Sequence, residues 1–141
     1  IDENLLAKLL SFVLNKIKPK NAKISVFGLG FRGDVTDTRL SPTYDVVNEF
    51  LKKGCIVTVH DPYIFEDKKL PKSVSLTKNI ADAIHDADLI FISSDHKIYS
   101  KLNSKLFSEG KKFILFFDGR NILNPKLFSE GLLNTIGIGK S

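Results

Sequence analysis

The amino-acid sequence predicts an α/β domain with three layers, in which helices cover a mostly parallel sheet of about five strands. Two observations support this class. Short apolar runs that are typical of buried strands alternate along the chain with segments whose apolar residues recur at helical spacing. In addition, the run Leu89-Ile90-Phe91-Ile92 is continuously apolar, as expected for a parallel strand that is buried on both faces.

Composition limits the class of protein further. The chain of 141 residues is 43% hydrophobic and 26% charged, which suits one folded core in water. No apolar run approaches the roughly 20 residues of a membrane span, so we expect no membrane partner. The basic residues, which give a net charge of +5, are spread over every segment, so we expect no nucleic-acid partner. A single cysteine excludes an internal disulfide and fits a cytoplasmic location.

The first expected element is an amphipathic helix over residues 2–17, which Pro19 ends. We treat residues 1–20 as an N-terminal helix and linker, and residues 21–141 as the α/β domain. Because the chain begins at Ile1 and not at methionine, it is compatible with being a piece of a longer protein.

The expected elements of the α/β domain follow from strand periodicity and helix-end signals. Ser41 suits an N-cap, Pro42 suits the first helical position, and Gly54 suits the residue after the helix end. Cys55 begins the next strand and is interpreted as a small buried residue, not as a nucleophile. We expect strands over 24–27, 55–60, 89–92, 113–117 and 135–138, helices over 42–53, 79–86, 102–109 and 124–130, and a polar segment with solvated lysines over 63–75.

A glycine-rich motif follows the first strand. Gly28, Gly30 and Gly33 have the G-x-G-x-x-G spacing of dinucleotide-binding loops. In that motif the helix begins directly at the glycines, whereas here the start signal comes only at Ser41. The expected acidic residue about 20 positions further on is also missing, since the first acid after the next strand is Asp61. The spacing therefore does not by itself indicate a Rossmann NAD site, although a self-contained NAD-binding domain stays open as an alternative.

Polar clusters follow three of the expected strands, and parallel strands bring such clusters to one edge of a sheet. The clusters are a loop with Arg32 and Arg39, the sequence Ser94-Asp95-His96, and the sequence Asp118-Gly119-Arg120. Arginines that converge there would form an anion site. Arg39 could instead form a structural ion pair with Asp37. His96 is interpreted as a loop hydrogen-bonding residue, and Asp118 as a residue that caps its turn or orients Arg120.

Several of these residues occur in a pattern that resembles the C-terminal domain of the UDP-glucose/GDP-mannose dehydrogenase family. The opening motif is Phe31-Arg32, followed by Asp37-x-Arg39-x-Ser41-Pro42, where family members usually have Phe-Lys and Asp-Asp-x-Arg-x-Ser-Pro. Asp61-Pro62, Asp95-His96, Asp118-Gly119-Arg120-Asn121 and Ile136-Gly137-Ile138-Gly139 are similar to further family motifs. The resemblance covers nearly the whole chain from Lys23 onward.

This resemblance implies an NAD-dependent nucleotide-sugar dehydrogenase in which this chain binds the UDP-sugar. Phe31, Arg32 and Arg120 would contact the nucleotide sugar, and Arg39 would reach NAD that is bound mainly by a domain absent from this chain. The family's catalytic thiol segment is also absent, so we expect no catalytic residue and no metal site here. Residues 1–20 would correspond to the end of a central dimerisation region, which implies a homodimer of the full-length enzyme.

The resemblance leaves the substrate and some alternatives open. UDP-glucose and UDP-N-acetylmannosamine are both candidate substrates, with the loop sequence closer to enzymes of the second type. Arg32 replaces the family's lysine and keeps its charge with a longer, forked group. A free-standing nucleotide-binding or regulatory module without catalysis would fit the same residues.

Overall fold

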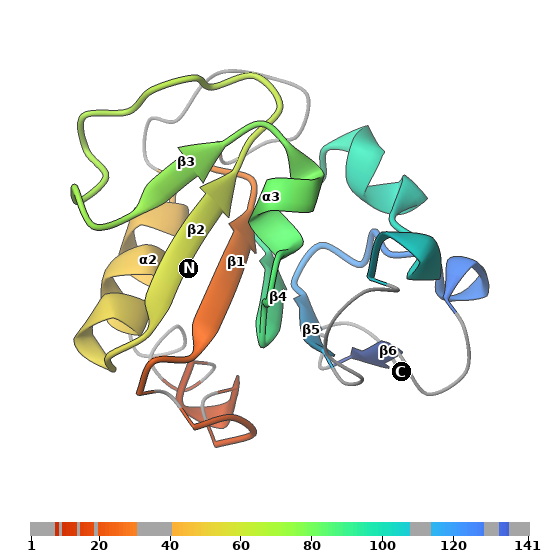
Figure 1. Cartoon of the computed structure of the whole chain (residues 1–141), viewed down its shortest axis with the longest axis horizontal. Coiled ribbons are helices and arrows are strands. Elements are labelled where there is room, and N and C mark those ends of the chain that lie inside the picture. The colour runs from red at the N-terminus through yellow and green to blue at the C-terminus, as the bar shows by residue number, and fades with distance from the viewer. Residues whose placement is uncertain are drawn as a thin grey trace.

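The computed structural model describes residues 8, 10–13, 15–18, 20–30, 41–107 and 114–128, together with the backbone of 133–135. These residues form one sheet of six parallel strands in the order β3-β2-β1-β4-β5-β6 (Figure 1). The predicted α/β class is therefore confirmed, with one strand more than expected. The strands are β1 (Lys23–Phe27), β2 (Ile56–His60), β3 (Ser75–Thr77), β4 (Leu89–Ile92), β5 (Ile114–Asp118) and β6 (Leu133–Thr135).

The central strands are apolar on both faces because each face has its own core. Alternate residues of a strand point to opposite sides of a sheet. In β4, Leu89 and Phe91 lie in one hydrophobic cluster, whereas Ile90 and Ile92 lie in the other. The first cluster includes the buried face of α2 (Thr43–Lys52), and the second includes residues of α3 (Ile80–Ile84). The two helices thus cover opposite faces of the sheet (Figure 1).

Helix α2 has nearly the bounds that its end signals predict. Pro42 is the N-cap, one position later than expected, and the Ser41 hydroxyl oxygen still accepts a hydrogen bond from the Thr43 N–H at 3.2 Å. Lys53 is the C-cap, and Gly54 follows with a φ of +88°, a conformation that favours glycine after a helix. Of the apolar residues that recur at helical spacing in this segment, Val46, Val47 and Phe50 are buried, and Leu51 is partly buried against the same cluster.

The prediction missed strand β3, which begins at Ser75, the last residue of the segment that was expected to be polar with solvated lysines. This strand has three residues and pairs only with β2, so it is a short strand at the edge of the sheet. Its residues are half-buried or exposed and lack the apolar pattern of the inner strands. Backbone pairing with β2 therefore decides its conformation.

The helices expected over 102–109 and 124–130 are replaced, in the described part, by short 3-10 helices. The replacements are Ser104–Phe107 and Pro125–Leu127, and a further 3-10 helix, Lys97–Lys101, precedes the first expected helix. The Asn103 and Asn124 carboxamide oxygens each accept a bond from the backbone N–H two residues later, which favours a local turn over a longer helix. Residues 108–110 and 129–130 lie outside the described residues.

The predicted N-terminal helix is present in part and ends early. Residues 8 and 10–13 are helical, but residues 15 and 16 form a turn and Ile17 a bend, so the helix does not extend to Ile17 as predicted. Leu10 and Val13 are buried in the first cluster, whereas Phe12 on the same segment is 49% exposed. Pro19, the expected stop signal, lies outside the described residues.

The last two strands are shifted from their predicted bounds. Strand β5 begins at Ile114 and extends through Asp118, one residue beyond the predicted end. Strand β6 ends at Thr135, where the predicted strand was to begin, and residues 136–138 are not among those described. Within the described segments, no helix has both the length and the apolar character that crossing a membrane requires.

Candidate nucleotide-binding edge

The carboxyl ends of the four central strands lie in register. Phe27 at the end of β1 pairs with His60 of β2 and with Ile92 of β4, and Ile92 pairs with Asp118 of β5. The polar residues that follow these strands therefore meet at one edge, as the sequence predicts. Because the strand order reverses between β1 and β4, this edge contains the topological switch point at which doubly wound sheets bind ligands.

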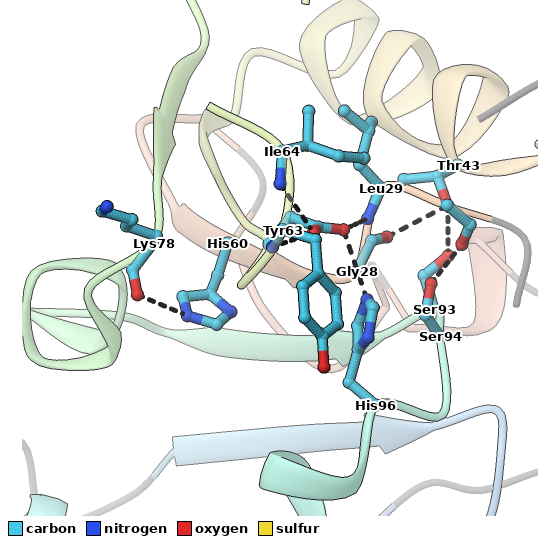
Figure 2. A network of polar contacts seen from close by, with 12 residues as sticks. Gly28, Leu29, Thr43, His60, Tyr63, Ile64, Lys78, Ser93, Ser94 and His96 are labelled. Carbon is cyan, nitrogen blue, oxygen red and sulfur yellow. Dashed lines mark hydrogen bonds and ion pairs between the residues drawn. The ribbon is translucent and has the colours of Figure 1, made fainter. Parts of the chain in front are cut away.

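The turn after β4 contacts both the loop after β1 and the start of α2. The Ser94 hydroxyl donates a short hydrogen bond to the Gly30 carbonyl, and the hydroxyls of Ser93 and Thr43 lie 2.6 Å apart (Figure 2). The Thr43 hydroxyl also donates to the Gly28 carbonyl at 3.3 Å. The two segments at the switch point are thus joined by side-chain hydrogen bonds.

Asp61 is a buried carboxylate at this edge that contacts several segments. One of its oxygens accepts bonds from the N–H groups of Tyr63 at 2.9 Å and Ile64 at 3.2 Å. The other oxygen accepts from the Leu29 N–H at 2.9 Å and lies 3.3 Å from His96 Nε2 (Figure 2). Burial by itself raises the pKa of Asp61, but the hydrogen bonds from His96, Tyr63 and Leu29 outweigh it and lower the pKa. Asp61 is therefore held as a carboxylate that ties three loops together.

His60 lies beside this carboxylate and belongs to a second buried contact. Its Nδ1 is 2.8 Å from the Tyr99 hydroxyl, and its Nε2 is 3.2 Å from the Lys78 carbonyl oxygen. A neutral ring satisfies both partners by accepting at Nδ1 and donating from Nε2. Burial lowers the pKa of His60, with the Lys78 carbonyl and Asp61 opposing the shift. His60 thus supports the edge as a neutral side chain.

Arg120 follows β5, at the position that the sequence predicts for an anion contact. Its Nη2 lies 3.2 Å from an oxygen of Asp95, and the two side chains are 32% and 46% exposed. The Asp118 carboxylate accepts bonds from the N–H groups of Arg120 at 3.2 Å and Leu123 at 2.8 Å. The prediction that Asp118 caps this turn is confirmed, because the buried carboxylate fixes the backbone that carries Arg120.

The structure brings together some predicted site residues and leaves others outside the described part. Arg120 and the Ser94–His96 turn lie at the same edge, joined by the contact between Asp95 and Arg120. Phe31, Arg32 and Arg39 lie outside the described residues, as do Asp37 and Gly33. The chain enters that segment after Gly30 and returns at Ser41, whose hydroxyl donates to the Leu29 carbonyl at 2.7 Å.

Sequence reasoning missed the buried network beneath the edge, namely Asp61, His60, Tyr99 and Thr43. The sequence identifies Asp61 only as the first acid after an expected strand and as part of a family motif, and His60 only as the last residue of that strand. Two titratable residues in succession at the end of an otherwise apolar strand were the available signal. Their partners are 35 and 39 positions further on, so spacing along the chain could not show the contacts.

Cys55 lies just before β2, at the other end of that strand from Asp61. Burial, together with the charge of Asp88, raises the pKa of its thiol to about 11. A thiol of this kind is almost fully protonated at neutral pH and is a poor nucleophile. The interpretation of Cys55 as a buried structural residue agrees with this environment. Among the residues that the structure describes, no group of three or more His, Cys, Asp or Glu side chains could hold a metal ion.

The fold and this edge define a doubly wound α/β domain with an arginine at the carboxyl edge of its sheet. Residues 25–125 match the model of the UDP-glucose/GDP-mannose dehydrogenase family, UDP binding domain. The chain belongs to this family, which confirms the resemblance found in the sequence, and the matched part is the UDP binding domain.

Curated relatives agree with this assignment. The chain is 31% identical over 126 residues to a UDP-N-acetyl-D-mannosamine dehydrogenase of Methanococcus aeolicus, covering 86% of this chain and 27% of the relative. A protein of the same name from Methanocaldococcus jannaschii is 32% identical over 139 residues, covering 92% of this chain and 31% of the relative. UDP-glucose 6-dehydrogenase 2 of Arabidopsis thaliana is 27% identical, with 94% and 32% covered. The chain thus spans about a third or less of these relatives.

Solved structures show the same fold. An NDP-N-acetyl-D-galactosaminuronic acid dehydrogenase from Methanosarcina mazei superposes with a TM-score of 0.80 at 27% identity, covering 98% of this chain and 29% of that chain. The UDP-N-acetyl-mannosamine dehydrogenase Cap5O from Staphylococcus aureus gives a TM-score of 0.77 at 26% identity, with 95% and 31% covered. In each case the similar region is one part of a longer enzyme.

Proposed function

We propose that this chain is the UDP-sugar-binding part of an NAD-dependent dehydrogenase that oxidises the C6 alcohol of a nucleotide sugar to the acid. The observation that carries the proposal is Arg120, which lies at the carboxyl edge of β5 in a chain of this family. A guanidinium has five N–H donors, so it can bind a carboxylate such as Asp95 and a phosphate oxygen together. We assign Arg120 to the nucleotide sugar, together with Phe31 and Arg32.

The proposal places NAD binding mainly outside this chain. In a dinucleotide site of the usual kind, the pyrophosphate lies on a helix that begins at the glycines. Here the helix-start signal in the sequence comes only at Ser41, and among the described residues the first helix after β1 is α2, which begins at Thr43, thirteen positions after Gly30. Arg39 would contact the cofactor from this side, as the family pattern implies. Two molecules of NAD would accept the two hydrides that are removed between the alcohol and the acid, with water supplying the second oxygen, and this chain would hold and orient the sugar nucleotide.

The nucleophile of the reaction is also assigned outside this chain. Oxidation of an alcohol to an acid in this family uses a cysteine, and the buried Cys55 with its raised pKa does not suit that role. The names of the relatives favour UDP-N-acetylmannosamine or UDP-glucose as the substrate. By the same family argument, the complete enzyme would be a homodimer that works in the cytoplasm.

An activity assay tests the whole proposal. The full-length protein that contains this chain should form NADH from NAD with UDP-N-acetylmannosamine or UDP-glucose, whereas the 141-residue chain alone should form none. Binding of UDP by the chain, with no NADH formed by the full-length protein from any UDP-sugar, would favour a regulatory nucleotide-binding module. NADH formation by the chain alone would contradict the assignment of the catalytic thiol and NAD to other parts.

A further inference from the structure

The turn after β4, residues 93–96, has a feature that the proposed binding residues do not explain. Each of its four consecutive side chains contacts a different segment at the carboxyl edge. The contacts are Ser93 with Thr43 at the start of α2, Ser94 with the Gly30 carbonyl after β1, Asp95 with Arg120 after β5, and His96 with Asp61 after β2. We call this segment the β4 turn.

Two contacts of the β4 turn are buried, namely those of Ser94 and His96. Ser94, His96 and Asp61 are all fully buried. In a buried environment a lost hydrogen bond leaves its partner unsatisfied, so the arrangement resists change. Through Asp61, the His96 ring is linked to the backbone N–H of Leu29.

The contact of Asp95 differs because it reaches a residue of the proposed site. Its carboxylate lies 3.2 Å from Nη2 of Arg120, and both side chains are partly exposed. An exposed ion pair adds little to stability, since solvent screens the charges and two long side chains must be ordered. It can still restrict the directions in which the guanidinium points. The effect of Asp95 should therefore appear in ligand binding more than in folding.

We propose that the β4 turn is the positioning element of the nucleotide site, in which Asp95 orients Arg120 and His96 acts through Asp61 on Leu29. This inference rests on the proposed function, because it concerns the binding of a UDP-sugar at the same edge. Asp95 and His96 are positioning residues and do not themselves bind the nucleotide. Their common turn fixes the distance between Arg120 and the backbone at the switch point between β1 and β4.

A double-mutant cycle tests the inference that Asp95 orients Arg120. Asp95→Ala in the 141-residue chain should weaken UDP binding about threefold to tenfold, as expected for loss of a partly exposed charge pair that orients a ligand group. In the Arg120→Ala background the same change should have no further effect, because Asp95 acts through Arg120. Glu49→Gln is the matched control, since Glu49 and Lys52 form an exposed pair at the same 3.2 Å on α2. It should leave UDP affinity unchanged.

A second pair of variants tests the inference that His96 acts through Asp61 on Leu29. His96→Gln keeps an N–H donor toward Asp61 and should retain UDP affinity within about threefold, whereas His96→Leu should lose roughly tenfold. Hydrogen exchange of the Leu29 amide should become faster in His96→Leu than in His96→Gln. Tyr99→Phe is the control, because it removes buried hydrogen bonds to His60 without touching Asp61 or Leu29. It should lower stability without a specific change at Leu29.

The possible results separate this inference from the proposed function. Wild-type chain that binds no UDP would overturn the proposed function and this inference with it. If Asp95→Ala leaves UDP binding unaffected, Asp95 does not orient Arg120. The same conclusion follows if Asp95→Ala weakens UDP binding equally with and without Arg120. Either result overturns the inference about Asp95 alone. Equal UDP affinity and equal hydrogen exchange of the Leu29 amide in His96→Leu and His96→Gln would overturn the inference about His96 alone.

Discussion

The Ser41 hydroxyl donates a hydrogen bond to the Leu29 carbonyl oxygen over 2.7 Å and joins the end of the β1 strand region to the start of α2. Ser41 is almost fully buried, and its oxygen also accepts a bond from the Thr43 N–H. Ser41, which the sequence predicts to be a helix cap, thus also joins the residues that precede segment 31–40 to those that follow it.

Ser41→Ala should lower the free energy of unfolding by about 1–3 kcal/mol, because a buried carbonyl and a backbone N–H both lose their partner. Chemical denaturation of the wild type and the variant measures this difference. Ser100→Ala is a matched control, since the Ser100 hydroxyl bonds the Lys97 carbonyl at the surface. Its effect should stay within about 0.5 kcal/mol. Equal losses in the two variants would contradict the role of Ser41.

The conformation of Gly28 supports a second prediction. Its φ is +100°, and a Cβ added there would overlap the Ser94 side chain and lie 2.9 Å from the Ser94 backbone nitrogen. Gly28→Ala should therefore cost about 3 kcal/mol or more, from backbone strain and overpacking together. Gly54 also has a positive φ, but the nearest atom to an added Cβ is 3.6 Å away. Gly54→Ala should cost only the strain, about 1–2 kcal/mol.

Thermal or chemical unfolding of these two glycine variants separates the cost of steric overlap from the cost of backbone strain. If Gly28→Ala costs no more than Gly54→Ala, the close approach between the β1 loop and the β4 turn is not a constraint. The larger expected cost at Gly28 means that this glycine has a structural reason to be present. Its place in a G-x-G-x-x-G pattern can therefore be explained without dinucleotide binding.

His60 should make stability depend on pH in the mildly acidic range. Burial lowers its pKa below the ordinary value of 6.5, so the unfolded chain binds a proton more readily than the native protein. The stabilising contribution is complete above about pH 6.5 and is lost as the pH falls from there toward the lowered native pKa. Asp61, whose pKa is also lowered, contributes in a more acidic window, below its ordinary value of 3.8.

Unfolding free energies measured at several pH values between about 6.5 and 5 check this sign. His60→Gln cannot titrate and should be less stable than the wild type near neutral pH, with a weaker dependence on pH across this range. His85→Gln is the control, since the His85 side chain is 76% exposed. A wild type that becomes more stable on acidification, or a His60→Gln variant with an unchanged slope, would show that His60 is not buried in its neutral form.

The two assigned arginines should affect different ligands in the full-length enzyme. Losing one charge-assisted contact costs about 1.5–3 kcal/mol, which is roughly ten- to a hundredfold in an equilibrium constant. Arg120→Ala should raise the apparent constant for the UDP-sugar with a smaller effect on that for NAD, and Arg39→Ala should do the reverse. Steady-state kinetics with each ligand varied in turn measures both. Matching losses for both ligands in both variants would mean that the two arginines belong to one structural ion-pair network.

The sequence predicts best those parts of the fold where local pattern and tertiary packing agree. Strand β4 has its predicted bounds because Leu89 to Ile92 are apolar and buried on both faces. The region around α2 was predicted closely because its start and end residues act through local hydrogen bonds. The short strand Ser75–Thr77 was missed because pairing with β2, and not its own pattern, decides its conformation.

The candidate site was predictable in its location and only partly in its construction. Arg120 and the Ser94–His96 turn follow apolar strands, so their place at one edge follows from a parallel sheet. The contact of His96 with Asp61 joins residues 35 positions apart, and only the register between strands brings them together. For the same reason, the sequence could assign His96 to hydrogen bonding in a loop but could not name its partner.

A calorimetric titration of the 141-residue chain with UDP and, separately, with NAD tests the central claim most directly. The account predicts measurable, weak binding of UDP or a UDP-sugar, and almost no binding of NAD. The arginine edge is present, whereas the helix-start signal comes only at Ser41 and α2 begins at Thr43. Binding of NAD that is tighter than binding of UDP would contradict the account and would favour a self-contained NAD-binding domain.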